Sequence, residues 1–209
     1  VQAIAGVVRP PRGAVSIAGI DPATASAGVV AKRVGFVFQN PEHQFVTGSV
    51  RDELAYGPLS LKMARELIDE RVDELLDRFG LTDAAHVNPF LLSGGQKRRL
   101  SVGTALITGA DVLVLDEPTF GQDRARADEL AGLLRGLHDE GTTVVVVTHD
   151  MQLVADAATS VVVLSDGHLL AHGAVDDVLG DDDLLARAGL RLPPLASAMR
   201  LVRRHPEWN

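Results

Sequence analysis

Two adjacent carboxylates, Asp116 and Glu117, directly follow the apolar run VLVL at residues 112–115. Such a run is typical of a buried strand, and α/β proteins bind ligands beyond the carboxyl ends of parallel strands. One carboxylate there can hold Mg²⁺, and its neighbour can polarise a water molecule, a role in which a positioned base contributes on the order of 10²–10⁴-fold. Because Asp-Glu-Pro is also common in solvated turns, the pair alone does not decide between these interpretations.

A second set of polar residues lies earlier in the chain, at the start of a predicted helix that ends near Gly109. These residues are Ser93, Gly94, Gly95 and Gln96. A serine hydroxyl, free backbone N–H groups and the positive end of a helix dipole together suit a phosphate group. An ordinary helix cap followed by two glycines would have the same sequence, so a purely structural role stays open.

Three further polar residues follow predicted strands or begin a predicted helix. Gln39 directly follows a strand predicted at residues 34–38, and its side-chain amide could contact both a metal ion and a water molecule. His149 follows a strand predicted at residues 142–148 and could donate a hydrogen bond to a γ-phosphate. Asp123 precedes a helix predicted at residues 124–140 and could simply cap it. Each residue alone is more typical of an ordinary surface position.

Taken together and in this order, these residues resemble the motifs of ATP-binding cassette (ABC) ATPases. In that resemblance Gln39 matches the Q-loop, residues 92–96 the signature motif, Asp116 and Glu117 the Walker B pair, Asp123 the D-loop and His149 the switch histidine. The resemblance covers residues 2–179. It implies an α/β fold of the P-loop NTPase-like ABC nucleotide-binding domain, with a mostly parallel sheet and a helical subdomain.

Two longer stretches narrow the resemblance. The runs VGFVFQNPEHQF at residues 34–45 and DELAYGPL at residues 52–59 resemble the ATPase subunits of energy-coupling factor (ECF) transporters, also called cobalt-type. That family takes up vitamins and transition-metal ions. The run FGQD at residues 120–123 departs from the usual small-Gly-Leu-Asp D-loop and resembles the second cassette of fused, two-cassette proteins.

The resemblance also implies a set of roles and partners. Two cassettes would enclose two ATP molecules with Mg²⁺ held by Asp116 and Gln39, while Glu117 acts as the base and His149 contacts the γ-phosphate. The residues that would face the nucleotide of the partner cassette, or the interface with it, are Ser93, Gly94, Gly95, Gln96 and Asp123. The second cassette would be identical, different or fused. An integral transmembrane subunit and a substrate-binding membrane subunit would hold the chain at the cytoplasmic face of the cell membrane.

No GxxxxGK[ST] phosphate-binding loop occurs in these 209 residues. We therefore expect the Walker A loop to lie upstream of Val1 and the chain to be an N-terminally truncated fragment. Positioning and electrostatic clamping supply nearly all of the catalysis in phosphoryl transfer. The isolated chain is accordingly expected to bind ATP poorly and to hydrolyse little of it.

The pattern of apolar residues predicts the elements that must position these groups. We expect a nucleotide-binding domain over residues 1–179, with its helical subdomain at about residues 50–109, and a C-terminal helical appendage over residues 180–209. Strands are predicted at residues 15–17, 34–38, 111–116, 142–148, 160–164 and 169–171, the last two forming a hairpin around Asp166-Gly167. Helices are predicted at residues 1–6, 49–80, 93–109, 124–140 and 150–157, after the aspartates at 181–183, and in the basic amphipathic stretch at 199–204.

Composition excludes several other classes of function. The net charge of −8 argues against a nucleic-acid-binding protein that neutralises phosphates. The absence of cysteine excludes disulfides and thiolate metal sites. The apolar runs are of strand length, and none approaches the roughly 20 residues that a membrane-spanning helix needs.

Two alternative functions stay open at this point. The chain could belong to an ABC ATPase that does not transport, although the ECF-like sequence of residues 34–59 favours transport. It could instead be a non-hydrolysing interaction subunit that only donates its signature motif, although the presence of Asp116, Glu117 and His149 argues against that. Co-purification with an integral membrane subunit would distinguish a transporter from a non-transporting ATPase.

Overall fold

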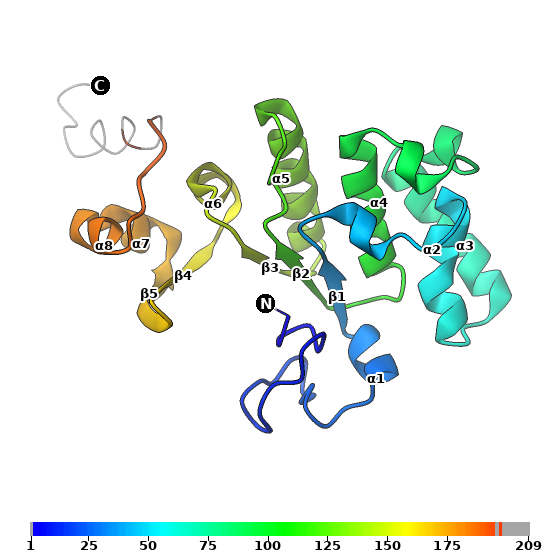
Figure 1. The fold of residues 1–209 in the computed structure, drawn as a ribbon, viewed down its shortest axis with the longest axis horizontal. Coiled ribbons are helices and arrows are strands. Elements are labelled where there is room, and N and C mark those ends of the chain that lie inside the picture. The colour runs from blue at the N-terminus through cyan, green and yellow to red at the C-terminus, as the bar shows by residue number, and fades with distance from the viewer. Residues whose placement is uncertain (1, 195–196, 198–209) are drawn as a thin grey trace. The chain divides into compact units, whose positions relative to one another are not determined.

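The computed structural model describes residues 2–194 and residue 197, which fall into two compact units (Figure 1). The first unit comprises Val1–Gln122 and Gly136–Val147, and the second comprises Asp123–Arg135 and Thr148–Asn209. The predicted helix at 199–204 lies outside the described residues. The predicted boundary between a nucleotide-binding domain at residues 1–179 and an appendage at residues 180–209 does not coincide with the division into these two units. That boundary stays a prediction.

A three-stranded parallel sheet forms the centre of the first unit. Its strands are β1 (Val34–Val37), β2 (Val112–Asp116) and β3 (Thr143–Val147), in the order β1-β2-β3. Strand β2 lies between the other two, and its residues 113–115 are fully buried. This agrees with the apolar run that predicted a central strand, because a strand covered on both faces needs no polar alternation.

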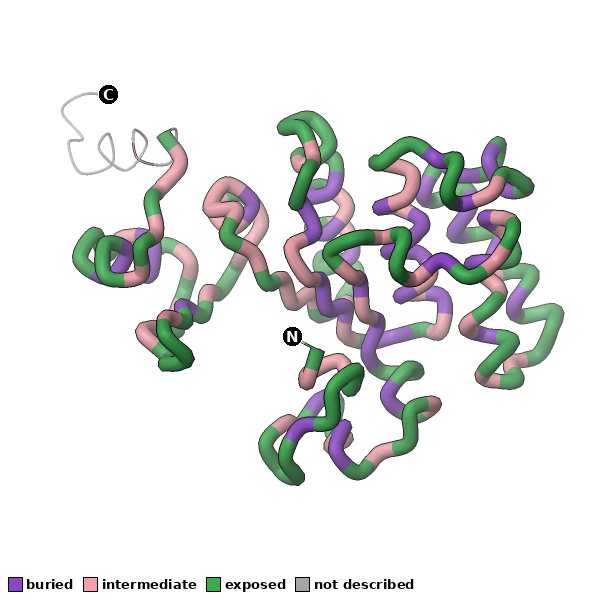
Figure 2. Tube along the Cα trace, in the orientation of Figure 1, coloured by how far each residue is buried: buried purple, intermediate pink, exposed green. Residues whose placement is uncertain are grey.

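Helices of the first unit pack beside this sheet. They are α1 (Ala27–Ala31), η1 (Pro41–Gln44), α2 (Val50–Ser60), α3 (Arg65–Arg78), η2 (Thr82–Ala84), η3 (Pro89–Leu91) and α4 (Gly94–Leu106), where η denotes a 3-10 helix. Buried positions recur along α2, α3 and α4 (Figure 2). The buried side chains Leu54, Val72 and Leu100 come one from each of these helices. The predicted helical subdomain at about residues 50–109 stays a prediction.

The prediction of one continuous helix over residues 49–80 is wrong, because the chain breaks between α2 and α3. Lys62 adopts a left-handed backbone with φ +56°, a conformation that ends a helix. Ser49 caps α2 by accepting a hydrogen bond from the backbone N–H of Asp52 at 3.1 Å. Gly80, with φ +60°, follows the end of α3 as predicted.

Two predicted elements near the start of the chain are also wrong. Residues 2–6 form hydrogen-bonded turns instead of a helix, and Gly6 has φ +70°. The predicted strand at 15–17 is reduced to a single antiparallel bridge between Ile17 and Ile20. The physical reason is the reversal at Ala18 and Gly19, which both have positive φ and turn the chain back before a ladder can extend.

The second unit contains a two-stranded antiparallel hairpin, β4 (Ser160–Ser165) and β5 (His168–Ala174). Its turn lies at Asp166 and Gly167, as predicted, and both residues have positive φ. The unit also holds α6 (Met151–Ala157), α7 (Val175–Gly180) and α8 (Asp182–Arg187), while α5 (Arg124–Asp139) contributes residues to both units. Val163 of the hairpin packs with Val178 and Leu184.

None of the helices in the described part of the chain is long and apolar enough to cross a membrane.

Helix α4 approaches β1 so closely that one glycine is required there. A Cβ atom on Gly35 would lie 2.2 Å from the backbone oxygen of Ala105. On the other side of α4, a Cβ on Gly103 would lie 3.0 Å from the side chain of Leu54. These two contacts fix α4 between β1 and α2.

We predict that Gly35→Ala lowers the free energy of unfolding by about 3 kcal/mol, because either strand or helix must shift to admit the methyl group. The matched control is Gly132→Ala in α5, where the nearest atom to a new Cβ is 4.0 Å away. That variant should gain about 0.5–1 kcal/mol from the better helix propensity of alanine. Urea unfolding measures both changes, and similar effects of the two substitutions would contradict the close packing.

Candidate functional site

Three of the predicted site residues meet at the carboxyl edge of the parallel sheet in the first unit. Val37 pairs with Leu115, so Gln39 follows the last paired residue of β1, and Asp116 and Glu117 follow its partner in β2. Gln39 is exposed, whereas Asp116 and Glu117 are half-buried. The structure therefore brings an amide and two carboxylates to neighbouring strand ends.

The backbone of Glu117 is held in an uncommon conformation. Its φ is +43°, a left-handed geometry that costs a residue with a Cβ roughly 1–2 kcal/mol. The N–H of Glu117 donates to the carbonyl of Val147 at 2.8 Å, and its own carbonyl accepts from the N–H of Phe120 at 3.1 Å. The chain thus turns sharply at Glu117 while still bonded to β3. Strain of this kind is frequent at functional sites.

A buried guanidinium, that of Arg98 in α4, fixes the backbone on the β1 side of this edge. Only 3% of Arg98 is exposed. Its Nη1 donates to the carbonyl of Phe38 and its Nη2 to the carbonyl of Gln39, both at 2.8 Å. Burial lowers the pKa of Arg98 to about 10, so the side chain still carries its charge at neutral pH. Its Nε has no hydrogen-bond partner among the described residues.

The side chain of Gln44 makes a second connection between this segment and α4. Its Oε1 accepts from the hydroxyl of Ser101 at 2.9 Å, and its Nε2 donates to Oγ1 of Thr104 at 2.7 Å. An ion pair between Lys97 and Glu42, 2.6 Å long, lies nearby. Residues 38–44 are therefore docked on the helix that begins with the signature-like motif.

A buried carboxylate holds the segment that follows. Glu53 of α2 is 4% exposed, and its Oε2 accepts from the N–H of Val46, the N–H of Thr47 and the hydroxyl of Thr47 at 2.8–2.9 Å. Neither Glu53 nor Arg98 is among the residues predicted from the sequence. The available signal was a charge at helical spacing from apolar positions: Glu53 lies three residues after Val50, and Arg98 four residues before Val102.

Ser93 caps α4, as predicted, through a reciprocal pair of hydrogen bonds. Its Oγ accepts from the N–H of Gln96 at 3.3 Å, and its N–H donates to Oε1 of Gln96 at 3.0 Å. In an α-helix the first N–H groups have no intrahelical acceptor, and this capping box leaves those of Gly94 and Gly95 directed out of the helix end. Because Ser93 and Gly94 are exposed, an anion can reach these donors.

The two remaining candidates belong to the second unit. Asp123 caps α5, since its Oδ1 accepts from the N–H of Arg126 at 3.0 Å. His149 is exposed and lies two residues after the end of β3. Asp150 follows it and caps α6 by accepting from the N–H groups of Gln152 and Leu153. The convergence of His149 with the carboxylates stays a prediction.

The donor set at the strand edge fits Mg²⁺ bound together with a nucleotide. Mg²⁺ is usually held by one or two carboxylates, with water and phosphate oxygens completing the octahedron. Asp116 and the amide oxygen of Gln39 are ligands of that kind. Within the described ranges, no group of three or more His, Cys, Asp or Glu side chains could form a metal site by itself.

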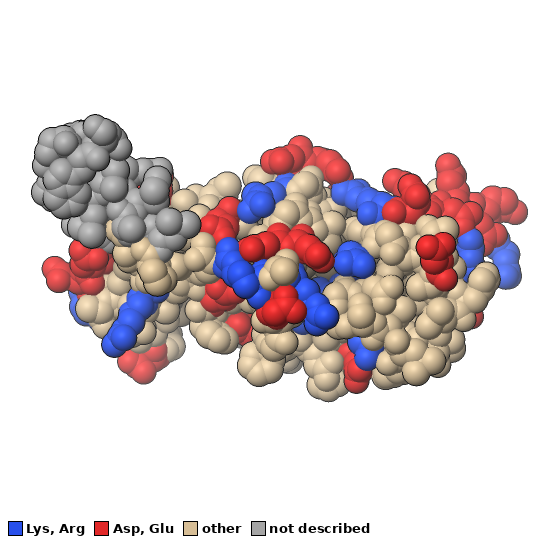
Figure 3. All heavy atoms as spheres, turned by 90° about the horizontal axis from the view of Figure 1, so that it is seen from above, with Lys and Arg blue, Asp and Glu red and all other residues tan. Residues whose placement is uncertain are grey.

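Acidic and basic side chains are interspersed on the face drawn in Figure 3. That face shows no continuous basic stripe among the residues the structure describes, the feature expected of a nucleic-acid-binding surface.

Comparison with known proteins gives consistent results. The sequence pattern of the family described as "ABC transporter" matches residues 1–120. A putative HMP/thiamine import ATP-binding protein of Bacillus subtilis is 47% identical over 165 residues, 78% of this chain and 29% of its own length. The energy-coupling factor transporter ATP-binding protein EcfA of Methanothermobacter thermautotrophicus is 36% identical over 95% of this chain and 64% of its own length. The chain thus spans less than two thirds of each of these relatives.

Among solved structures, cbiO1 from Clostridium perfringens, described as part of the ABC transporter complex cbiONQ, superposes with a TM-score of 0.77. The two sequences are 29% identical, and the match covers 95% of this chain and 80% of that one.

We predict that Arg98→Met loosens the segment that carries Gln39, because the carbonyls of Phe38 and Gln39 lose their donors. Each unpaired buried acceptor costs roughly 1–3 kcal/mol, partly offset by no longer burying a charge. Backbone amides of residues 38–44 should exchange hydrogen faster, as measured by mass spectrometry. The control Lys32→Met removes an exposed cation that follows α1 in the same unit. Equal protection of residues 38–44 in both variants would show that Arg98 does not fix the segment.

Proposed function

The chain belongs to the ABC transporter family, and on that premise we propose that it is part of the ATP-hydrolysing subunit of an energy-coupling factor importer. The observation that carries the proposal is the placement of Gln39, Asp116 and Glu117 at adjacent strand ends of one sheet. The names of relatives and of the cbiO1 structure support import as the coupled process. The transported solute would be a vitamin or a transition-metal ion.

At the strand edge, each side chain would have a distinct task. Asp116 and the amide oxygen of Gln39 would hold Mg²⁺ directly or through water, and the bound ion would neutralise charge on the β- and γ-phosphates. Glu117 would accept a hydrogen bond from the attacking water and orient it. The hydrogen bond from Glu117 N–H to Val147 fixes the backbone of that base.

At the start of α4, the capping box leaves donors for a phosphate group. We propose that Ser93, Gly94, Gly95 and Gln96 contact the nucleotide held mainly by a second cassette. In the second unit, Asp123 would lie at the interface with that cassette, and His149 would hydrogen-bond the γ-phosphate of this cassette's own nucleotide. ATP would then join two cassettes, and hydrolysis would release them.

Four components of the proposed transporter would come from outside these 209 residues. They are the phosphate-binding loop, the second cassette, an integral transmembrane subunit and a substrate-binding membrane subunit. The greater length of the first two relatives supports an additional segment in the working protein. Residues 40–49 and helix α2 would transmit closure to the transmembrane subunit at the cytoplasmic face of the membrane. Arg98 of α4 bonds the backbone just before residues 40–49, and Glu53 of α2 bonds Val46 and Thr47 within them.

We predict that the isolated 209-residue chain binds ATP only weakly, because no lysine-bearing phosphate loop is present to grip the β- and γ-phosphates. Isothermal titration with Mg-ATP should give no saturable heat at micromolar nucleotide. The control is a longer form of the protein that includes a phosphate loop, titrated under the same conditions. Micromolar affinity of the isolated chain would refute the dependence on an external loop.

In that longer form, we predict that Glu117→Gln retains ATP binding but lowers steady-state ATP hydrolysis by on the order of 10²-fold or more, because an amide cannot act as the base. Cassettes trapped with ATP should then accumulate as dimers, which size-exclusion chromatography detects. The control, Glu70→Gln, removes an exposed carboxylate of α3 and should leave turnover unchanged. An unaltered rate in Glu117→Gln would rule out Glu117 as the base.

A further inference from the structure

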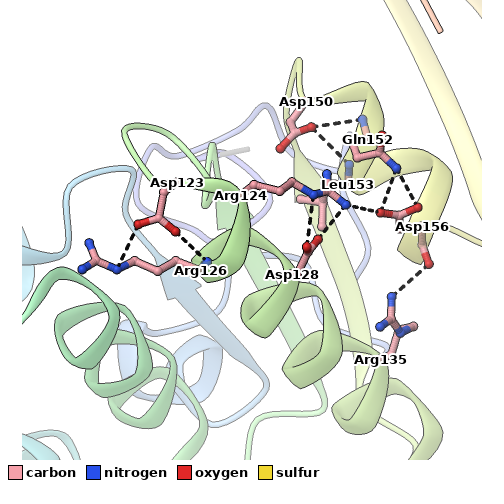
Figure 4. A network of polar contacts seen from close by, with 9 residues as sticks. All are labelled: Asp123, Arg124, Arg126, Asp128, Arg135, Asp150, Gln152, Leu153 and Asp156. Carbon is pink, nitrogen blue, oxygen red and sulfur yellow. Dashed lines mark hydrogen bonds and ion pairs between the residues drawn. The ribbon is translucent and has the colours of Figure 1, made fainter. Parts of the chain in front are cut away.

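A network of ion pairs and hydrogen bonds in the second unit centres on Arg124, the first residue of α5 (Figure 4). Its Nη2 lies 2.9 Å from Oδ2 of Asp156 and 2.6 Å from Oδ1 of Asp128, and its Nε donates to Oδ2 of Asp128 at 3.1 Å. Asp128 is one turn further along α5, whereas Asp156 belongs to α6. One guanidinium therefore joins two helices that are far apart in sequence.

Asp156 has further partners that hold it in place. Nε2 of Gln152 donates to both carboxylate oxygens of Asp156 at 2.9 and 3.0 Å, and Nη1 of Arg135 donates to the Asp156 backbone carbonyl at 3.1 Å. Partial burial would raise the pKa of Asp156, but the hydrogen bonds from Gln152 and Arg124 outweigh it and lower the pKa. The hydrogen bond with Asp156 in turn raises the pKa of Arg124.

The two helices joined in this way start beside candidate site residues. Asp123 directly precedes Arg124 and caps α5. His149 directly precedes Asp150, which caps α6 by accepting from the N–H groups of Gln152 and Leu153. Gln152 thus bonds Asp150 through its backbone and Asp156 through its side chain. Hydrogen bonds and ion pairs thus run from Arg124 through Asp156 and Gln152 to Asp150. Asp123 and His149 are the chain neighbours of the two ends of this network.

We propose that Arg124 is a positioning residue that holds the backbone of Asp123 and the backbone of His149 in one fixed relation. The proposal rests on the function proposed above, in which both residues serve ATP hydrolysis. Arginine suits this task because its planar fork can bind two carboxylates at once, which the single ammonium of lysine cannot do with the same geometry.

The magnitudes favour positioning over stabilisation as the main effect. The side chain of Arg124 is 53% exposed and that of Asp156 is 35% exposed. Ion pairs this exposed contribute little to folding, because water and salt screen them. By contrast, a displacement of about 1 Å in a catalytic group can lower a rate by about 10²-fold. The loss of Arg124 should therefore change turnover far more than stability.

The first test uses the 209-residue chain itself and needs no activity. Arg124→Gln should increase the hydrogen-exchange rate of the Gln152 and Leu153 amides several-fold, because Gln152 loses a fixed partner in Asp156. The control is Arg187→Gln, which removes an exposed arginine from α8 in the same unit. Exchange rates in Arg124→Gln that match those in Arg187→Gln would overturn the coupling between the helices.

The second test measures ATP hydrolysis in a longer form that contains a phosphate loop. Arg124→Gln and Asp156→Asn should each lower kcat by about 10-fold with KM for ATP changed less than twofold, an effect of misplacement and not of binding. The double variant should be no slower than either single variant, and Arg124→Lys should be intermediate. Thermal unfolding of every variant, with Arg187→Gln as the control, identifies losses caused by instability.

The outcomes separate the two proposals. Absence of hydrolysis by the unsubstituted longer form would refute the proposed function. Normal hydrolysis with unchanged kcat in Arg124→Gln would refute the positioning role alone. Multiplicative losses in the double variant would also refute it, because independent residues give additive free energies.

Discussion

The buried guanidinium of Arg98 joins the helix that starts at Ser93 to the backbone that carries Gln39. Both of its Nη atoms bond carbonyls at the end of β1, where the ladder with β2 has just ended. Without side-chain donors at that point, two carbonyls would be left unpaired and the segment after the strand would lose its anchor. The position of Gln39 beside Asp116 therefore depends on α4, and α4 can lie close enough only because residue 35 is glycine.

Helix capping connects the chemistry of this protein with its architecture. Ser93, Asp123 and Asp150 each cap a helix. Ser93 and Asp123 belong to candidate motifs, and Asp150 directly follows the candidate residue His149. The structural role and the functional role of Ser93 are compatible, because its capping box uses its own N–H and that of Gln96 while the intervening glycine donors face outward. Residues that fix a helix start thereby also fix the groups that would contact phosphate.

Much of the fold could be predicted from the sequence, because strands and helices must bury apolar side chains. A strand covered on both faces therefore shows an unbroken apolar run, and a packed helix shows apolar residues about every 3.6 positions. The three parallel strands and the hairpin at Asp166-Gly167 are confirmed. The errors occurred where the backbone reverses at positive φ: at Lys62, which has a Cβ atom, and at Gly6, Ala18 and Gly19 near the start of the chain. At the site, Gln39 and Asp116 were predictable from strand ends. Arg98 and Glu53 were not, because a charged residue on a helix usually faces solvent and only packing reveals its burial.

We propose that one divalent cation binds between the ends of β1 and β2 in the working protein. The most direct measurement is a crystal structure of a form with a phosphate loop, bound to Mn²⁺ and a non-hydrolysable ATP analogue, with the ion located by anomalous scattering. We expect one anomalous peak within about 2–5 Å of both the Asp116 carboxylate and the Gln39 amide oxygen, the range spanned by direct and water-mediated ligation. A peak bound to the nucleotide but remote from both side chains would contradict it.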